Sequence, residues 1–258
     1  MDLGLTGKIA VVTGANRGLG LEACRQTATM GYRAVLTARG KTKGERAVAG
    51  LRRDGLDAAF CQLDVTDAAS VRRLARFVAR QGGRLDALVN NAGILIDGEE
   101  GPLGLKVAAL SRTFETNVAG PLRVAQALAP LMDRGGRIVN VSSSAGQFKN
   151  LSAHWPSYGV SKAALNALTK TLAREHARDG IRVNAVCPGP TDTPLFQSYK
   201  DAGDYGRRVF ESISRSFPLR RIGQPEDLPG AVAVLISDDA AVITGQILSV
   251  SGGLTMQD

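Results

Sequence analysis

Cysteine and histidine are scarce in this sequence, and their scarcity limits the chemistry it can carry. Three cysteines (Cys24, Cys61 and Cys187) and two histidines occur in 258 residues. The cysteines lie far apart in apolar segments, so they predict small buried side chains in a reducing compartment and no disulfide set. Because His154 and His176 are isolated from each other and from the cysteines, we expect no metal site.

Long hydrophobic runs are also absent. No apolar stretch approaches the roughly 20 residues that a membrane helix needs. Residues 1–8 contain no basic segment followed by an apolar one, so no secretion signal is predicted. We therefore expect a cytoplasmic protein with no membrane partner.

Acidic residues are fewer than basic ones: the chain has 24 Asp and Glu and 32 Lys and Arg, which gives a net charge of +8. The excess is dispersed along the chain. Arg72, Arg73, Arg76 and Arg80, for example, alternate with apolar residues on a predicted amphipathic helix, which is typical of a solvated face. We expect no nucleic-acid partner, and an anionic cofactor is the better use of part of this charge.

The chain does contain a regular alternation of short apolar runs and helical patterns. Runs such as 8–12, 33–37 and 85–89 have the composition of buried parallel strands. Seven such units predict a single α/β domain over residues 1–258. We expect a Rossmann-type, doubly wound, mostly parallel seven-stranded sheet with helices on both faces, and a helical substrate flap at about 190–217.

The first strand-like run leads into a glycine-rich loop and then into a helical pattern. The spacing is Gly-x-x-x-Gly-x-Gly, which allows a tight turn and a close approach of the backbone to a pyrophosphate at the helix N-terminus. The candidate cofactor-binding residues of this loop are Gly14, Asn16, Arg17, Gly18, Leu19 and Gly20.

The end of the second strand-like run indicates which dinucleotide is bound. Folds that bind NAD place an Asp or Glu there for the ribose 2′-hydroxyl, whereas this chain has Ala38 followed by Arg39. A guanidinium can hold a 2′-phosphate that a carboxylate would repel, and Arg17 is a second candidate for the same phosphate. Either arginine alone is more often a surface residue, but together they predict NADP(H).

Tyr158 and Lys162 are four residues apart, so on a helix they share one face. A phenol beside an ammonium can exchange a proton near neutral pH, because a cation lowers its reference pKa of about 10. Such a pair alone is usually a solvated face. A hydroxyl-rich strand end at residues 142–144 lies where open α/β sheets place their chemistry.

Together these motifs resemble the short-chain dehydrogenase/reductase family over nearly the whole chain, from Lys8 to Gly253. The motifs that carry the resemblance are Thr13 with Gly14-x-x-x-Gly18-x-Gly20, Asn90-Asn91-Ala92-Gly93, Ser142-Ser143-Ser144, Tyr158-x-x-x-Lys162 and Pro188-Gly189.

The resemblance implies a role for each catalytic residue. By its offset from Arg137 the catalytic serine corresponds to Ser143, with Ser142 or Ser144 as alternatives. Tyr158 would donate and accept the proton, Lys162 would lower its pKa and hold the nicotinamide ribose, and Asn117 would bend its helix and hold a water in the proton path. The other implied cofactor contacts are Asp64 and Val65 beside the adenine, Asn91, Ala92 and Gly93 beside a ribose, and Pro188, Gly189, Thr191 and Thr193 at the nicotinamide carboxamide.

Residues on both sides of the catalytic tyrosine are candidates for the substrate pocket, although a lone loop histidine is more often polar surface. The candidates are Ala145, Phe148, His154, Trp155, Pro190, Leu195 and Phe196. The stretch 94–110, acidic at Asp97, Glu99 and Glu100, is expected to form a loop over the mouth of the site.

Within the family, the segments 18–26 and 36–39 look similar to the carbonyl-reductase branch. We therefore expect an NADP(H)-dependent enzyme that reduces the ketone or aldehyde carbonyl of a small molecule to an alcohol. The alternatives are a 3-oxoacyl-thioester reductase with an acidic carrier protein, which the basic residues Arg207, Arg208 and Arg215 would suit, and a non-catalytic NADP-binding sensor. Because the chain lacks the long insertion that monomeric members of the branch carry between serine and tyrosine, we expect a homotetramer, or a dimer.

Overall fold

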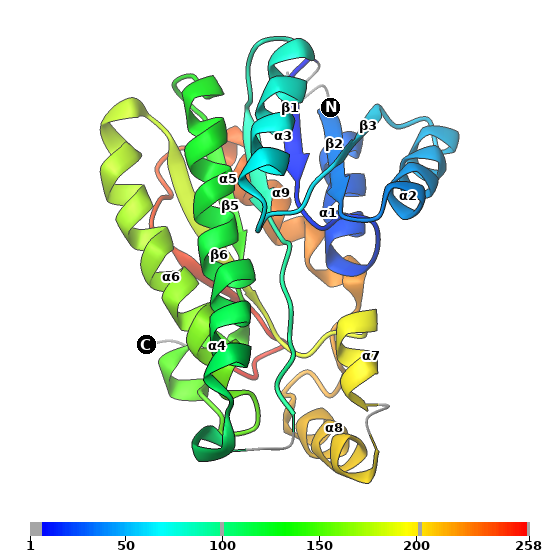
Figure 1. Ribbon diagram of the computed structural model, residues 1–258, viewed down its shortest axis with the longest axis vertical. Helices are drawn as coiled ribbons and strands as arrows, with labels where there is room; N and C mark the ends of the chain where they lie inside the picture. The colour runs from blue at the N-terminus through cyan, green and yellow to red at the C-terminus, as the bar shows by residue number, and fades with distance from the viewer. Residues whose placement is uncertain (1–6, 99–100, 201–202, 257–258) are drawn as a thin grey trace.

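The computed structural model describes residues 7–98, 101–200 and 203–256, and within these ranges the chain forms one seven-stranded parallel sheet (Figure 1). The strand order is β3-β2-β1-β4-β5-β6-β7. The sheet thus starts near its middle at β1 and winds outward in both directions, which confirms the expected doubly wound fold. The strands are β1 (Ile9–Val12), β2 (Arg33–Ala38), β3 (Ala58–Gln62), β4 (Ala87–Asn90), β5 (Arg137–Val141), β6 (Arg182–Pro188) and β7 (Ile247–Val250).

Helices cover both faces of the sheet, because both faces of its strands are apolar. Along β1, Ala10 and Val12 belong to one buried cluster, while Ile9 and Val11 belong to another. The first cluster includes α1, α2 and α9, and the second includes α3, α5 and α6. The helices are α1 (Gly18–Thr29), α2 (Lys41–Arg53), α3 (Ala68–Arg80), α4 (Val107–Phe114), α5 (Gly120–Leu128), α6 (Pro156–His176), α7 (Pro194–Lys200), α8 (Asp204–Ser216) and α9 (Pro229–Ile236).

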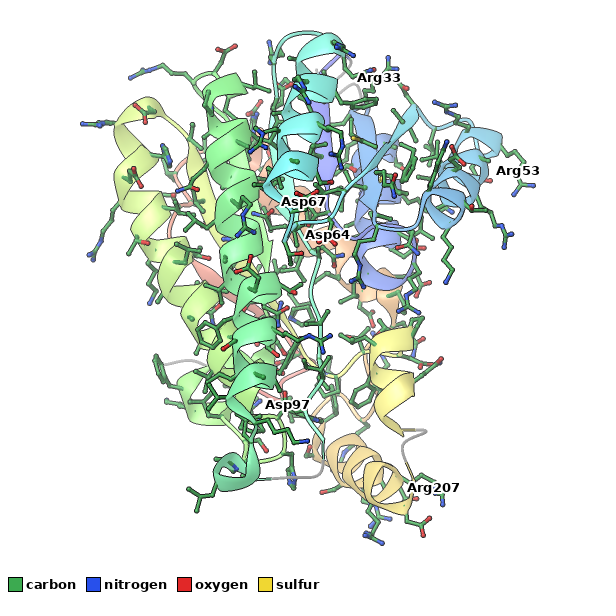
Figure 2. The ribbon with its side chains drawn as sticks, viewed as in Figure 1. Arg33, Arg53, Asp64, Asp67, Asp97 and Arg207 are labelled. Atoms are coloured by element: carbon green, nitrogen blue, oxygen red, sulfur yellow. The ribbon has the colours of Figure 1, made fainter. Side chains whose placement is uncertain are left out.

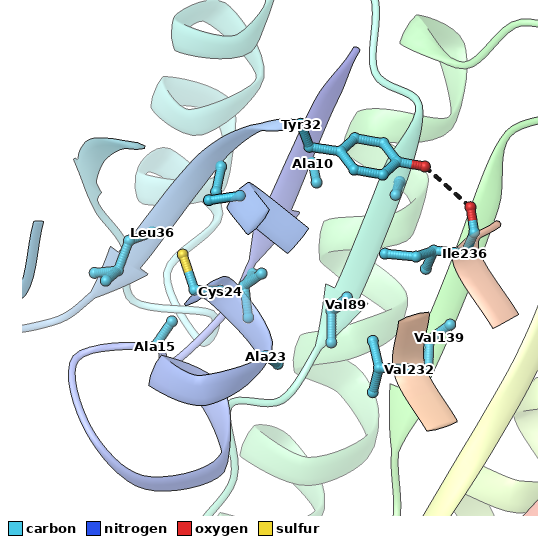
Figure 3. Close-up of a cluster of buried hydrophobic side chains, with 14 of the residues drawn as sticks. Ala10, Ala15, Ala23, Cys24, Tyr32, Leu36, Val89, Val139, Val232 and Ile236 are labelled. Atoms are coloured by element: carbon cyan, nitrogen blue, oxygen red, sulfur yellow. Dashed lines mark hydrogen bonds between the residues drawn. The ribbon is translucent and has the colours of Figure 1, made fainter. Parts of the chain in front are cut away.

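The buried cluster on the α1 and α9 face contains residues from early and late parts of the sequence (Figure 3). Tyr32, just before β2, is fully buried and donates its hydroxyl hydrogen to the Ile236 carbonyl at 2.9 Å. Val232 and Ile236 of α9 pack with Val89 and Val139 of the central strands. The last helix therefore supports the strands whose ends carry the site.

Helix α3 has the amphipathic character that the sequence predicts. Asp67 caps its N-terminus, accepting from the amides of Ala69 at 2.8 Å and Ser70 at 3.1 Å. Val71, Leu74 and Val78 are buried, and the four arginines of the helix are exposed. All three cysteines are buried and free. Within the described ranges no helix has both the length and the apolar character needed to cross a membrane.

The connections at the carboxyl ends of the strands extend the molecule on one side of the sheet (Figure 1). The segment after β4 runs out between α4 and the pair α7 and α8. Helices α7 and α8 fall in the range 190–217, but a single domain with a substrate flap stays a prediction. Within the stretch 94–110, a short 3₁₀ turn (Pro102–Gly104) precedes α4, so that stretch is not all loop. Glu99 and Glu100 lie outside the described residues.

Candidate active site

Two adjoining cavities lie along the carboxyl ends of the strands. The smaller has a volume of about 220 Å³ and the larger about 480 Å³. Leu19, Asn91, Gly93, Thr193 and Leu195 line both, so the two form one continuous groove. This is the position at which an open α/β sheet binds its ligand.

The smaller cavity is built on the glycine loop after β1. Gly14 has φ +64°, and a Cβ added there would lie 2.8 Å from the Cα of Ala92. A Cβ at Gly20 would lie 2.3 Å from the side-chain nitrogen of Asn91 and 2.7 Å from the Gly14 carbonyl oxygen. The loop therefore requires glycine at both positions to lie against the segment after β4.

The Asn-Asn-Ala-Gly motif holds this loop in place. The Asn91 side chain donates to the carbonyls of Thr13 and Gly14 at 2.9 and 3.1 Å. The backbone amides of Asn91 and Ala92 donate to the Thr13 hydroxyl at 2.9 and 3.0 Å. These bonds join the ends of β1 and β4, so the motif shapes the groove as well as lining it.

The electrostatics of the smaller cavity suit an anionic ligand. Helix α1 points its N-terminus at the groove and has no acidic residue in its first turn. Its N-cap residue, Arg17, makes no side-chain cap. Arg17 and Arg39 are exposed and line the groove, and Ala38 at the end of β2 is buried. Burial raises the pKa of Asp64, but hydrogen bonds from Thr66 and the charge of Arg39 outweigh it, so this pKa is lowered.

Every cofactor-binding residue predicted from the sequence lies on this groove. The smaller cavity is lined by Gly14, Asn16, Arg17, Gly18, Leu19, Gly20, Arg39, Asp64, Val65, Asn91, Ala92, Gly93 and Thr193, and the larger by Tyr158, Lys162, Pro188, Gly189 and Thr191. Their individual roles stay predictions.

The larger cavity brings together the serine triplet and the tyrosine. Ser143 hydrogen-bonds to Tyr158, and this bond acts to lower the tyrosine pKa. Ser142 instead donates to the Lys162 carbonyl at 3.1 Å, and Ser144 is buried at 3% exposure. The geometry therefore favours Ser143 over its two neighbours as the partner of Tyr158.

A glycine allows the serine segment to approach α6. Ser143 precedes the 3₁₀ turn η4 (Ser144–Gly146), and a Cβ on Gly146 would lie 2.6 Å from the Lys162 carbonyl carbon. That distance is shorter than any normal carbon contact, so a side chain here would push the turn off the helix. Close packing of η4 on α6 is what brings Ser143 to Tyr158.

The pKa of Tyr158 is raised in this structure, whereas the sequence predicts that Lys162 lowers it. Burial raises the pKa of Tyr158 to about 12, and the Ser143 bond only partly opposes it. The Lys162 ammonium lies 5.6 Å from the tyrosine ring centre and donates to the Val141 carbonyl at 2.8 Å. Burial lowers the pKa of Lys162 itself to about 8. Near neutral pH the phenol is therefore protonated, and the lysine is still mostly charged but closer to its titration range.

Asn117 lies behind the groove, in a π-helical segment, η2 (Glu115–Ala119), between α4 and α5. Its amide oxygen accepts from the Ile94 amide at 2.8 Å, and its amide nitrogen donates to the Ile94 carbonyl and the Ser161 hydroxyl. A Cβ on Gly93 would lie 3.3 Å from the Asn117 oxygen and 3.5 Å from the Lys162 nitrogen, so both polar groups adjoin this glycine. Its role in a proton path stays a prediction.

Most of the predicted substrate-pocket residues line the larger cavity. Phe148 is the exception, because its side chain is 85% exposed and lies away from the cavity wall. The lining residues among the candidates are Ala145, His154, Trp155, Pro190, Leu195 and Phe196.

Two features of the site escaped the sequence reading. Ser212 and Ser216 line the larger cavity from α8, beside Arg208, which the sequence indicated only as a basic flap residue. The four-residue spacing of the three on a helix was a signal that could have placed them at the cavity together. Asp97 was expected in a loop over the mouth, but it is buried at 8% exposure and bonds to the start of α6. No local pattern marks that contact, because its partners lie some 60 residues further along the chain.

Comparison with known proteins agrees with this geometry. The family model described as enoyl-(acyl carrier protein) reductase, a short-chain dehydrogenase/reductase model, matches residues 14–255. The 3-oxoacyl-[acyl-carrier-protein] reductase FabG of Staphylococcus aureus is 38% identical over 252 residues, spanning 96% of this chain and 98% of that protein. The 7alpha-hydroxysteroid dehydrogenase of Escherichia coli is 34% identical over 254 residues, spanning 98% and 96%.

A solved structure of a variant actinorhodin polyketide ketoreductase with NADPH has a TM-score of 0.86 and 35% identity, covering 96% of this chain and 97% of that one. Sequence match, fold and site geometry therefore agree. The chain belongs to the short-chain dehydrogenase/reductase family, and it is an oxidoreductase that interconverts a carbonyl and an alcohol.

Proposed function

We propose that this protein is an NADP(H)-dependent reductase that converts the ketone or aldehyde carbonyl of a small molecule to an alcohol. The observation that carries the proposal is the groove itself. Ser143, Tyr158 and Lys162 line its larger cavity, and the glycine loop lines the adjoining one. A dinucleotide along the glycine loop would therefore end beside the hydroxyl pair.

The residues present fit NADP(H). The loop closes on Ala92 only because position 14 is glycine, and the open N-terminus of α1 suits a pyrophosphate. Arg17 and Arg39 supply two guanidinium groups, and β2 ends in Ala38 without the carboxylate that would repel a 2′-phosphate. The bound dinucleotide would supply the hydride.

The chain's own residues provide the proton and hold the carbonyl. The Ser143 and Tyr158 hydroxyls share a hydrogen bond and line the larger cavity, so a carbonyl oxygen placed between them accepts from both. As negative charge develops on that oxygen, Tyr158 transfers its proton to it. Burial raises the pKa of Tyr158 to about 12, so the phenol is protonated near neutral pH and can act as the acid in carbonyl reduction.

A 3-oxoacyl thioester is the second candidate substrate. The FabG relative is named for that reaction. Of the three basic flap residues, Arg207 pairs with Asp204 and Arg215 with Glu211, whereas Arg208 lines the larger cavity. A cationic group at that wall suits the phosphate of a carrier-linked substrate. A non-catalytic NADP-binding sensor is the weakest alternative, because binding alone needs neither Ser143 nor Tyr158.

The test is NADPH consumption, followed at 340 nm, over 4-nitrobenzaldehyde, 9,10-phenanthrenequinone, ethyl acetoacetate and an acetoacetyl thioester. Tyr158→Phe should nearly abolish turnover, and Ser143→Ala should lower kcat by roughly a hundredfold. Ser142→Ala is the matched control and should have a much smaller effect, because that hydroxyl bonds to backbone. Undiminished turnover by Tyr158→Phe would refute the mechanism. The thioester reading predicts that Arg208→Ala raises KM for the thioester and leaves KM for the aldehyde unchanged.

We also propose a cytoplasmic homotetramer, with a dimer as the alternative. Val160 on α6 is 49% exposed and Leu248 on the edge strand β7 is 42% exposed, so apolar side chains lie outward on two separate surfaces. Two different twofold contacts could cover them. Three buried free cysteines are compatible with a reducing compartment. Light scattering on the purified protein distinguishes monomer, dimer and tetramer by mass.

A further inference from the structure

The catalytic helix starts without a cap from its own sequence. Helix α6 begins at Pro156 after Trp155, which makes no side-chain cap. Proline has no N–H, so the amides of Ser157 and Tyr158 are the first that need an acceptor from outside the helix. Tyr158 is therefore in the turn where a helix is least constrained by its own hydrogen bonds.

Asp97 supplies the missing cap from a distant part of the chain. One of its carboxylate oxygens accepts from the Ser157 amide at 2.9 Å and from the Ser157 hydroxyl at 2.6 Å. The other oxygen accepts from the Tyr158 amide at 3.0 Å. Both oxygens are used, and Asp97 is only 8% exposed. The contact thus holds the backbone of the tyrosine itself.

The segment that carries Asp97 is tied down on its other side. Figure 2 shows Asp97 on the connection that leaves β4 beside α4. Three residues earlier, the backbone N–H of Ile94 donates to the Asn117 side chain, and the Ile94 carbonyl accepts from it. The Ser157 hydroxyl also lies 3.2 Å from the hydroxyl of Thr113 on α4. Asp97 therefore links the first turn of α6 to the loop after β4 and, through Ser157, to α4.

We propose that Asp97 is a positioning residue for hydride transfer: its carboxylate fixes the first turn of α6 and so holds the Tyr158 hydroxyl against Ser143. The proposal rests on the proposed role of Tyr158 as proton donor. Misplacing a reacting group by about 1 Å can cost on the order of a hundredfold in rate. Loss of the cap should therefore lower kcat without weakening the binding of NADPH, whose candidate contacts lie mainly on other elements.

The chain offers a matched control in Asp67, which caps α3 through two backbone amides and takes no part in the site. Asp67→Ala removes a helix cap, as Asp97→Ala does, but leaves the tyrosine alone. Asp97→Asn keeps one acceptor oxygen and replaces the other by an N–H donor, so it should give an intermediate result and serves if Asp97→Ala does not fold.

The experiment measures kcat per NADPH-binding site, KM for NADPH and Tm for all three variants, with the best panel substrate of the wild-type enzyme. We expect Asp97→Ala to lose roughly tenfold or more in kcat with KM for NADPH within about twofold. Asp67→Ala should have a lower Tm than the wild type and an unchanged kcat. Full kcat in Asp97→Ala and Asp97→Asn, with Tyr158→Phe inactive, would overturn the positioning role alone. Full turnover by Tyr158→Phe would instead overturn the proposed function.

Discussion

Replacing Lys162 by methionine should remove activity and yet stabilise the folded protein at neutral pH. The Lys162 side chain is 4% exposed, and its ammonium donates to the Val141 carbonyl at 2.8 Å. Burial lowers its pKa from 10.5 to about 8. In the wild-type protein, the burial of a charged group therefore lowers the free energy of unfolding. The variant, with an uncharged methionine of similar shape, lacks this cost.

The magnitude follows from the two pKa values. The difference between 10.5 and about 8, at about 1.4 kcal/mol per pH unit, corresponds to ~3 kcal/mol in the free energy of unfolding. Methionine also leaves the Val141 carbonyl without its donor, which costs about 1 kcal/mol at every pH. The expected net gain below pH 8 is about 2 kcal/mol.

The sign changes with pH. Below pH 8 the lysine is charged in both folded and unfolded protein, so the full cost is present. Between pH 8 and 10.5 the unfolded wild-type protein binds more protons than the folded one, so its stability rises with pH. The variant has no lysine at this position, so its stability does not show this rise. The advantage of the variant should thus shrink and then reverse to a disadvantage of about 1 kcal/mol above pH 10.5.

Denaturant unfolding of both proteins from pH 7 to pH 10, followed by circular dichroism, measures this difference. Tyr158 and the cysteines are common to both proteins, so their titration largely cancels. Lys170→Met is the matched control: Lys170 is exposed on the same helix, and its replacement should give no comparable gain. If the curves of wild type and Lys162→Met stay parallel over this range, burial does not perturb this lysine and the reasoning fails.

Two further substitutions test the groove and the packing beneath it. Arg39→Asp should weaken NADPH binding at least tenfold and leave NADH binding nearly unchanged, measured by fluorescence titration; equal losses for both would remove Arg39 from the 2′-phosphate. Gly146→Ala should lower the free energy of unfolding by about 1–3 kcal/mol, measured by thermal unfolding, because the new Cβ would lie 2.6 Å from the Lys162 carbonyl carbon. In the control Gly50→Ala, where a Cβ meets nothing within 4 Å, the free energy of unfolding should instead rise by roughly 0.5–1 kcal/mol. If Gly146→Ala is as stable as the wild type, η4 can move away from α6 without cost.

Much of the site could be predicted from sequence because its parts are local patterns. The glycine spacing after β1, the absence of an acid at Ala38, and the four-residue interval from Tyr158 to Lys162 each act within one loop or helix. The parallel fold follows from apolar runs that need burial on both faces. Parallel strands end at one edge, so placing those motifs at strand ends also places them near one another.

The protonation of the site could not be read in the same way. The spacing of Tyr158 and Lys162 is compatible with a lowered tyrosine pKa, but burial raises the tyrosine pKa and lowers that of the lysine. Burial depends on every element packed around the pair. The exposure of Phe148 has the same origin, because a residue beside a catalytic motif in sequence need not face the cavity.

The sequence by itself determined the family, the doubly wound sheet and the identity of the hydroxyl–lysine set, because these depend on periodicity and short motifs. Only the tertiary structure decided that Ser143, and not Ser142 or Ser144, bonds to Tyr158, and that Asp97 caps the helix that carries it. Both contacts join segments far apart in the chain. Their geometry is set by how η4, α4 and the segment after β4 pack against α6.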